Sequence, residues 1–518
     1  MKTAKRERTT APERVRFGIV GLDEILGGGL SANHIYLIDG DPGTGKTTVG
    51  LQFLIEGRDR GESVMYVTLS ETVDELRGSA ASHGWSLDGV EIFELAAGQP
   101  AATGNDAYTL FHPSEIELQE TMDTVLETIR EKNPARVVID SLSEMRLLAR
   151  DPLRFRRQIL ALKQFFLNRE STVIVLDDRT APDGDMQLHS LAHGVIILEH
   201  LAVDYGSERR RLQVKKMRGA QFRGGFHDFR IQTGGLEVYP RLETIGEADL
   251  PKSEAVASGS PELDSLLGGG LTSGTSTLVT GAAGTGKSIL CLQYAIAAAS
   301  RGEKVHFYLF DERAATFRAR AAALRIPLKK AEKEGTIVLF QIEPTQMSPG
   351  EFAHQIRHAI LEEGVQMLVI DSINGYMQAM PAERLLPIQV HEVLSFCANN
   401  GVTSLLTLVQ HGVFGGPVDE AAEVSYLADT VVLLRYFEHA GAVRQAISAV
   451  KKRSGSHERT IREFKVGTGG LRVGEPLTAF RGVLSGIPEY SGRDEPLMSP
   501  AVAPGAPAGM PQPRRRRG

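Results

Sequence analysis

The feature that most constrains this chain is a long internal repeat. Residues 21–30 read GLDEILGGGL and residues 262–271 read ELDSLLGGGL, while residues 35–47 (IYLIDGDPGTGKT) match residues 276–288 (STLVTGAAGTGKS). The same offset of 241 residues separates Lys46 from Lys287 and Glu71 from Glu312. A solenoid unit spans only about 20–50 residues. A constant offset of this size therefore indicates that a whole domain was duplicated.

Within each copy, short apolar runs alternate with longer segments of helical spacing. The runs are 35–38, 64–69, 137–139, 172–176 and 195–198 in the first copy, and 276–279, 305–310, 368–370, 403–409 and 431–434 in the second. They are too continuous for strands with one face in water, so each sheet should be buried on both sides. We predict an α/β fold of two tandem domains, each with a mostly parallel sheet flanked by helices.

Composition sets the limits of these domains. A polar stretch at 245–252 carries Pro251, and the chain becomes rich in Pro, Ala and Gly after about residue 490 before it ends in Arg514–Arg517. We predict a flexible N-terminus (1–13), domain 1 (14–247), domain 2 (248–490) and a disordered tail (491–518).

Both copies contain a G-x-x-x-x-G-K-[ST] loop between a predicted strand and a predicted helix. In this context glycines let backbone N–H groups converge on phosphate oxygens, and the following helix adds its positive N-terminal end. Two such matches in register predict two ATP-binding loops, with Lys46 and Lys287 reaching the β- and γ-phosphates. The predicted loop residues are Gly40, Asp41, Pro42, Gly43, Thr44, Gly45, Lys46, Thr47, Thr48, Gly281, Ala282, Ala283, Gly284, Thr285, Gly286, Lys287, Ser288 and Ile289.

The loops also predict Mg²⁺ as a cofactor. The Thr47 and Ser288 hydroxyls would hold the ion, and a second oxygen usually comes from an Asp at the end of an apolar strand. RVVID places Asp140 at such a position, and MLVID places Asp371 there.

Overall composition excludes several classes of protein. The net charge is −6, with 42% hydrophobic and 24% charged residues, which is ordinary for a soluble globular chain and does not favour a nucleic-acid binder. No run of about 18 apolar residues exists, and no apolar segment follows the basic N-terminus as a secretory signal would require. We expect a cytoplasmic protein without a membrane or nucleic-acid role.

At this point the residues resemble a known family. The duplicated GGGL…GxxGTGK[ST]…LQ[FY] pattern, KMRG at 216–219, KKRSG at 451–455 and IREF at 461–464 are similar to the KaiC-type circadian-clock ATPases. These belong to the RecA-like P-loop NTPases and form double-ring hexamers. The resemblance covers about residues 14–486. The closing FRGVLSGIP at 480–488 looks more like the stand-alone bacterial members than the cyanobacterial clock protein.

The resemblance implies catalytic carboxylates after the second strand of each domain, where the family has an adjacent pair that polarises the attacking nucleophile. The second copy reads LFDER, so Asp311 and Glu312 fill both positions. The first copy reads TLSET, so Ser70 replaces the first carboxylate and Glu71 remains. We therefore expect chemistry mainly in the second domain and ring assembly as the main role of the first.

The resemblance also implies residues that act between subunits. In the family a Lys and an Arg from a neighbouring subunit reach the γ-phosphate, and the matching residues are Lys216, Arg218, Lys451 and Arg453. A homohexamer is therefore expected, with signalling or clock-type protein partners.

The clock protein phosphorylates adjacent Ser and Thr residues in its second domain. The stretch AEVSYLADTVVLL keeps Ser425 but has Tyr426 in place of Thr, so Ser425 is the candidate phosphorylation site of a serine/threonine autokinase. Two alternatives stay open, because fold does not fix function: a RecA- or RadA-like DNA-dependent ATPase, and an ATP-gated scaffold for partner proteins.

Overall fold

The computed structural model describes residues 13–94, 113–149, 151–167, 169–179, 186–202, 206–243, 254–343, 345–378, 386–410, 426–483 and 489–490. The chain divides into two compact units, residues 1–243 with 343–358 and residues 244–342 with 359–518. The predicted boundary at 245–252, residues 1–12 and the tail at 491–518 lie outside the described residues.

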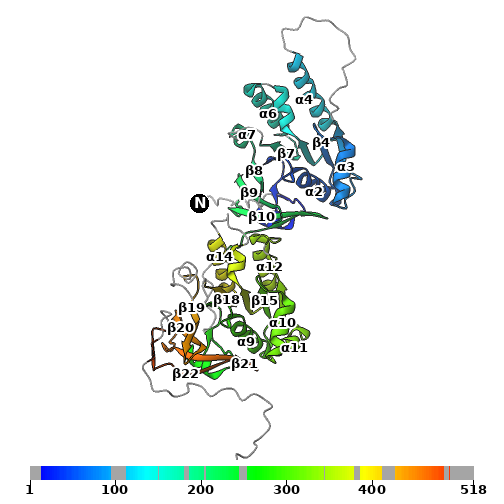
Figure 1. Ribbon diagram of the computed structural model, residues 1–518. Coiled ribbons are helices and arrows are strands. Elements are labelled where there is room, and N and C mark those ends of the chain that lie inside the picture. The colour runs from blue at the N-terminus through cyan, green and yellow to red at the C-terminus, as the bar shows by residue number, and fades with distance from the viewer. Residues whose placement is uncertain are drawn as a thin grey trace, which may run out of the picture. The chain divides into compact units, whose positions relative to one another are not determined.

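The first unit is built on a nine-stranded sheet in the order β11-β10-β9-β8-β3-β7-β6-β4-β5 (Figure 1). Strands β8, β3, β7, β6, β4 and β5 are parallel, while β9, β10 and β11 continue the sheet in antiparallel fashion. The strands are β3 (Ile35–Gly40), β4 (Val64–Thr68), β5 (Glu91–Glu94), β6 (Arg136–Asp140), β7 (Thr172–Asp178), β8 (Gly194–Leu201), β9 (Arg209–Met217), β10 (Phe226–Gln232) and β11 (Gly235–Tyr239).

Helices cover both faces of this sheet. Successive residues of a strand point to opposite faces, so neighbouring residues of one strand pack against different helices. Tyr36 and Ile38 pack in one hydrophobic cluster with residues of α2, whereas Leu37 packs in another with residues of α5 and α6. The helices are α1 (Val20–Ile25), α2 (Lys46–Asp59), α3 (Val73–Ser82), α4 (Pro113–Lys132), α5 (Leu142–Ala149), α6 (Pro152–Phe166) and α7 (Met186–Leu191). The strands read as continuous apolar runs because both faces are buried.

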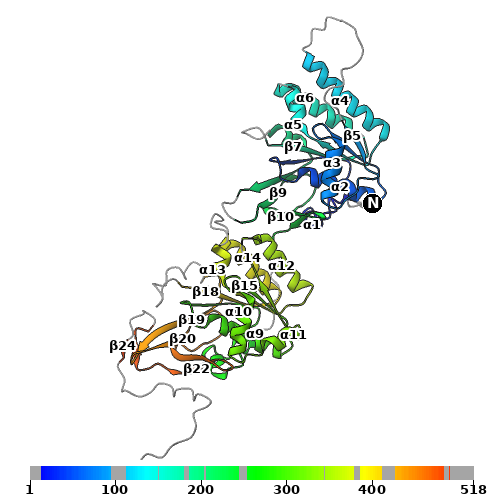
Figure 2. The ribbon, with the colours of Figure 1, turned by 45° about the vertical axis from the view of Figure 1, so that its right-hand side comes forward.

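The second unit repeats this architecture in the order β16-β15-β17-β18-β14-β19-β20-β21-β22 (Figure 2). Its strands are β14 (Ser276–Gly281), β15 (Val305–Leu309), β16 (Ile337–Gln341), β17 (Met367–Asp371), β18 (Thr403–Val409), β19 (Thr430–His439), β20 (Ala442–Lys452), β21 (Arg462–Gly467) and β22 (Gly470–Pro476). The helices of this half of the chain are α8 (Pro261–Leu266), α9 (Lys287–Ser300), α10 (Ala314–Ala323), α11 (Leu328–Lys333), α12 (Pro349–Leu361), α13 (Ile373–Gln378) and α14 (Leu386–Asn399).

The predicted fold class is confirmed: two tandem, mostly parallel sheets flanked by helices. Short two-stranded pairs complete the units, β1 (Arg14–Val15) with β2 (Leu30–Ser31), β12 (Ala255–Val256) with β13 (Leu271–Thr272), and β23 (Phe480–Arg481) with β24 (Glu489–Tyr490). Among the described residues, none of the helices combines the length and apolar character needed to cross a bilayer.

Candidate functional site

Each G-x-x-x-x-G-K-[ST] loop joins a central strand to a helix, as predicted. The first connects β3 to α2, and the second connects β14 to α9, so each helix begins at the loop lysine. The preceding glycines Gly45 and Gly286 have φ values of +98° and +100°, a region that other residues rarely adopt. A Cβ on Gly45 would lie 2.6 Å from Ile231 Cδ1. Glycine at this position therefore permits both the turn and the packing beside it.

The loop lysines fold back over their own loops. Lys46 Nζ donates to the carbonyl oxygens of Gly40 and Asp41 at 2.8 and 2.9 Å. Lys287 Nζ donates to Gly281 and Ala282 at 2.9 and 2.7 Å. Burial lowers the pKa of Lys287 to about 8, and the Asp371 carboxylate partly opposes that shift. Both ammonium groups lie where they can meet phosphates bound in the loop.

A hydroxyl and a strand-end carboxylate meet beside each lysine. Thr47 Oγ1 donates to Asp140 Oδ2 at 3.1 Å, and Ser288 makes the equivalent hydrogen bond to Asp371. Burial raises the pKa of both carboxyl groups. Mg²⁺ beside nucleotide phosphates is commonly bound by hydroxyl and carboxylate oxygens. The two predicted ligands in each unit therefore fit the ion.

The carboxylates of the second unit line a cavity of about 500 Å³. Asp311 accepts a hydrogen bond from Ser372 Oγ, and Glu312 Oε2 lies 2.7 Å from Arg320 Nη2. Burial raises the pKa of Glu312, while Arg320 opposes the shift. The cavity is also lined by Ala283, Gly284, Gly286, Lys287, Ser288, Ile289, Asp371, Val409 and Gln445. The structure thus brings the predicted phosphate loop, metal ligands and carboxylates of this unit together.

In the first unit, Glu71 is half-buried at the end of β4. Burial is the first cause that raises the pKa of its carboxyl group, and the nearby Asp140 carboxylate is the second. The neighbouring Ser70 is the residue that stands where the second unit has Asp311. Glu71 therefore lies near the Asp140 end of this site.

Asp178 is a candidate residue that the sequence reasoning missed. It ends β7 beside Gly40, and its Oδ1 lies 2.7 Å from Lys46 Nζ. Its other oxygen accepts a hydrogen bond from Ser143 Oγ at 3.0 Å, and Ser143 in turn contacts Ser141. The signal was present in the sequence, because LDDR places two carboxylates at the end of a strand beside the loop.

Strand register identifies the counterpart of Asp178 in the second unit. Gly40 pairs with Asp178, whereas Gly281 pairs with Val409. Asn374 replaces Ser143 and exchanges hydrogen bonds with the Val409 backbone at 3.2 and 2.7 Å. Ser141 is therefore linked through Ser143 to Asp178, at the end of β7. Its counterpart Ser372 is linked instead to Asp311, which follows β15.

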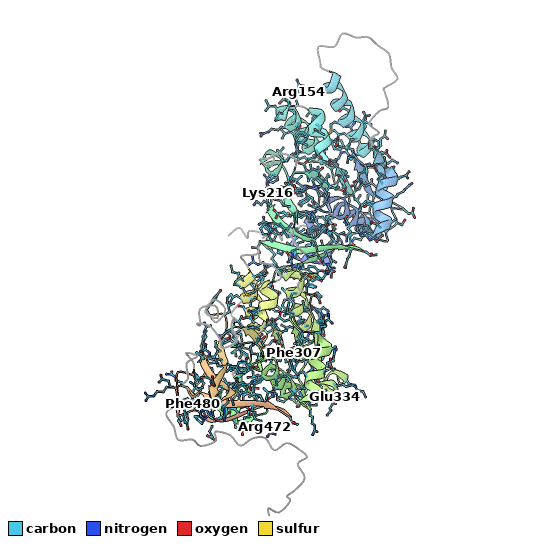
Figure 3. The ribbon with its side chains drawn as sticks, in the orientation of Figure 1. Arg154, Lys216, Phe307, Glu334, Arg472 and Phe480 are labelled. Atoms are coloured by element: carbon cyan, nitrogen blue, oxygen red, sulfur yellow. The ribbon has the colours of Figure 1, made fainter. Side chains whose placement is uncertain are left out.

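The predicted Lys and Arg pairs lie apart from the loops of their own units. Residues 216 and 218 flank Met217, which pairs with Gly194 at the start of β8, and Lys451 pairs with Val431 at the start of β19. The loops follow the opposite ends of the parallel strands β3 and β14. Lys216, labelled in Figure 3, donates to the carbonyl oxygens of His189 and Ala192 at 2.6 and 2.8 Å. Arg453 lies 3.5 Å from Asp429.

The candidate phosphorylation site Ser425 lies outside the described residues. The next residue, Tyr426, is exposed, and its carbonyl oxygen accepts a hydrogen bond from Arg453 at 3.0 Å.

Comparison with known proteins agrees with the duplicated architecture. The family model described as "ATPase: KaiC" matches residues 15–243 and again residues 256–478. The circadian clock protein KaiC3 of Synechocystis sp. is 26% identical, over 94% of this chain and 97% of its own. The circadian clock oscillator protein KaiC of Picosynechococcus sp. is 25% identical, over 93% of this chain and 94% of its own. The chain belongs to the KaiC family of ATPases.

Proposed function

We propose that this protein binds Mg-ATP at both loops and hydrolyses it chiefly in the second unit, within a homohexamer. The observation that carries the proposal is the 500 Å³ cavity of the second unit, in which Lys287, Asp371, Asp311 and Glu312 converge. Thr47, Asp140, Ser288 and Asp371 would hold Mg²⁺, which neutralises phosphate charge when bound. The corresponding domains are 14–247 and 248–490.

In the second unit, the chemical step would use the carboxylates as proton acceptors. A water oxygen bonds to the γ-phosphorus while the bond to the β,γ-bridging oxygen breaks, and a carboxylate takes the proton from water. The raised pKa of Glu312 makes it a better base than an ordinary glutamate. Arg320 fixes the orientation of Glu312 through the contact at 2.7 Å.

The geometry of the Lys and Arg pairs supports action between subunits. Lys216 and Arg218 lie at the end of the sheet opposite to the loop at Lys46, so they cannot meet phosphates in that loop. A neighbouring copy in a ring can present its loop to them, where two cations would stabilise the charge of the γ-phosphate. Lys451 and Arg453 would act in the same way in the second unit.

We further propose Ser425 as the acceptor of an autokinase reaction. Support comes from the sequence match and from relatives that are named as circadian clock proteins. Signalling or clock-type protein partners would then read the ATP or phosphorylation state.

Steady-state ATP hydrolysis and native mass spectrometry test the ATPase proposal. Glu312→Gln should lower hydrolysis by about 100-fold or more, the range expected for loss of a general base. Glu71→Gln is the matched change in the first unit and should lower the total rate far less. Equal losses in the two variants would contradict the assignment to the second unit. Strong stimulation by single-stranded DNA would instead support a DNA-dependent ATPase.

Assembly and phosphorylation need separate measurements. Hexamer mass should depend on ATP, and Lys216→Ala with Arg218→Ala should weaken assembly without removing ATP binding at Lys46. γ-Labelled ATP followed by peptide mapping should label the wild type and not Ser425→Ala. Label that persists in this variant would remove Ser425 as the acceptor.

A further inference from the structure

A pocket of about 140 Å³ in the first unit lies at the end of the sheet remote from its phosphate loop. His34 immediately precedes β3 and His193 immediately precedes β8, so both histidines lie at the starts of parallel strands. Lys163 of α6, Arg218 after β9 and Asn33 complete its polar lining. The pocket therefore gathers basic side chains from four elements.

The cations around this pocket are held by backbone carbonyl groups. Lys163 Nζ donates to Leu191 at 3.0 Å and Arg218 Nη2 donates to Ser190 at 2.9 Å. Lys216 beside them donates to carbonyl oxygens in the same turn. Within the described part of the chain, none of these three cations pairs with a carboxylate. Their charge is available to an anion.

The two histidine rings lie against each other in this pocket. Their ring centroids are 3.7 Å apart, and His34 Nδ1 donates to the carbonyl oxygen of Ala32 at 2.5 Å. Burial lowers the pKa of His193 to about 4, and His34, Arg218 and Lys216 act in the same direction. The Tyr36 ring of β3 also contacts His193, with 5.7 Å between the ring centroids.

The second unit lacks this arrangement. Tyr36 pairs with Gly194 and Thr277 pairs with Thr430, so Asp429 stands where the first unit has His193. Asp429 lies 3.5 Å from Arg453 and accepts a hydrogen bond from Ser276 N at 3.0 Å. A carboxylate thus balances the Arg in the second unit, whereas the first unit gathers positive charge without one among its described neighbours.

A phosphate bound in the loop of the first unit cannot reach this pocket. The loop follows the far end of β3, and a strand of six residues is about 20 Å long. An anion in the pocket must come from solution or from another molecule.

We propose that His34, His193, Lys163 and Arg218 form a proton-coupled pocket for a phosphate group, supplied by the nucleotide of a second copy of this chain. This inference rests on the proposed ring assembly and adds residues and a proton requirement to it. An anion beside the rings favours the charged form of the His193 imidazole, so its binding raises the pKa of His193 and takes up protons. Binding should strengthen as pH falls, by up to about tenfold per pH unit for one linked proton.

Calorimetry with sodium sulfate tests the pocket, because sulfate itself does not titrate near neutral pH. Titrations at pH 7 in buffers of different ionisation enthalpy measure the protons taken up. Wild type should bind sulfate with proton uptake, and His34→Asn with His193→Asn should lose that uptake. His391→Asn, on an exposed position of α14, is the matched control and should behave as wild type. Sulfate binding without proton uptake, or no binding, would overturn the proposal.

ATP-driven assembly tests the source of the phosphate. Native mass spectra at pH 6.5 and pH 8 should show wild-type assembly at lower ATP concentration in the more acidic buffer, and His34→Asn with His193→Asn should reduce that difference. If both proteins assemble with the same pH dependence, the second-copy source is wrong while ring assembly stands. If the wild type never assembles with ATP, the ring proposal fails, and sulfate binding with proton uptake would then indicate a free anion as the occupant.

Discussion

Replacement of Asp178 by Asn should strengthen ATP binding at the first loop. The Asp178 carboxylate lies 2.7 Å from Lys46 Nζ, and the two side chains are 27% and 8% exposed. Phosphates compete with this carboxylate for the lysine, and they are repelled by its charge. Asn keeps the size of the side chain and an acceptor for Ser143, but it removes both opposing effects.

The magnitude follows from the burial of the pair. At 2.7 Å and an effective dielectric of about 20, the gross attraction is about 6 kcal/mol. Desolvation offsets most of it, and a hydrogen bond to a charged group contributes about 1.5–3 kcal/mol net. Taking about 1.5 kcal/mol for this partly exposed pair, Asp178→Asn should tighten binding roughly tenfold.

Calorimetric titration with a non-hydrolysable ATP analogue provides the assay. A Lys287→Ala background restricts binding to the first loop. Asp177→Asn is the matched control, because Asp177 precedes Asp178 on β7 but lies 2.5 Å from Arg146 instead of the loop lysine. An affinity that is unchanged or weaker in Asp178→Asn would refute the view that Asp178 competes with phosphate for Lys46.

Three further predictions concern pH and stability. Because Lys287 has a pKa of about 8 without nucleotide, and phosphate favours its charged form, ATP affinity at the second loop should fall above pH 8, by up to about tenfold per pH unit. Titrations at pH 7, 8 and 9 in a Lys46→Ala background measure this, and a flat profile would contradict it. Gly45→Ala should abolish nucleotide binding at the first loop and cost about 1–3 kcal/mol in unfolding free energy, because a Cβ would meet Ile231 at a φ of +98°. Thermal melting with and without ATP checks this result, and Gly61→Ala, which also has a positive φ but no neighbour within 4 Å, separates backbone strain from steric contact. Arg136→Met should lower the free energy of unfolding in urea by about 2–4 kcal/mol, because Glu62 loses its two contacts with Arg136 at 2.6 and 2.7 Å. A decrease under about 1 kcal/mol would show that this ion pair does not stabilise the fold.

Sequence reasoning recovered the strands that are buried on both faces. All ten predicted apolar runs overlap strands, from β3 at Ile35–Gly40 to β19 at Thr430–His439. The edge strands β5 and β16 were not predicted. EIFE mixes polar and apolar residues, whereas IVLFQ contains an apolar run of the kind used for the other strands and was missed. Strands β9 and β20 were also missed, since mixed polar and apolar residues there do not form a continuous apolar run.

The site was predictable to the extent that it depends on short motifs. The loop and the strand-end Asp are close in space because parallel strands end at the same edge, so their juxtaposition could be anticipated. The Lys46–Asp178 pair could not, because it depends on β3 lying beside β7, an order of strands that local patterns do not determine. The same holds for the His34–His193 contact, which depends on β8 lying on the other side of β3.

Asp178 changes how the loss of a carboxylate at Ser70 should be understood. Beyond the strand-end Asp, the second unit has Asp311 and Glu312, both from the end of one strand. The first unit has Glu71 from the corresponding strand and Asp178 from β7. The two sites therefore place these carboxylates differently. In the second unit both lie clear of the loop lysine, whereas in the first one of them is paired with it. In the first loop the charge of Lys46 is neutralised by Asp178, so a bound phosphate must displace that carboxylate. In the second loop Lys287 is buried and has no such carboxylate partner among the described residues. That difference in starting state, more than the number of carboxylates, is the physical reason to expect unequal ATP chemistry in the two halves.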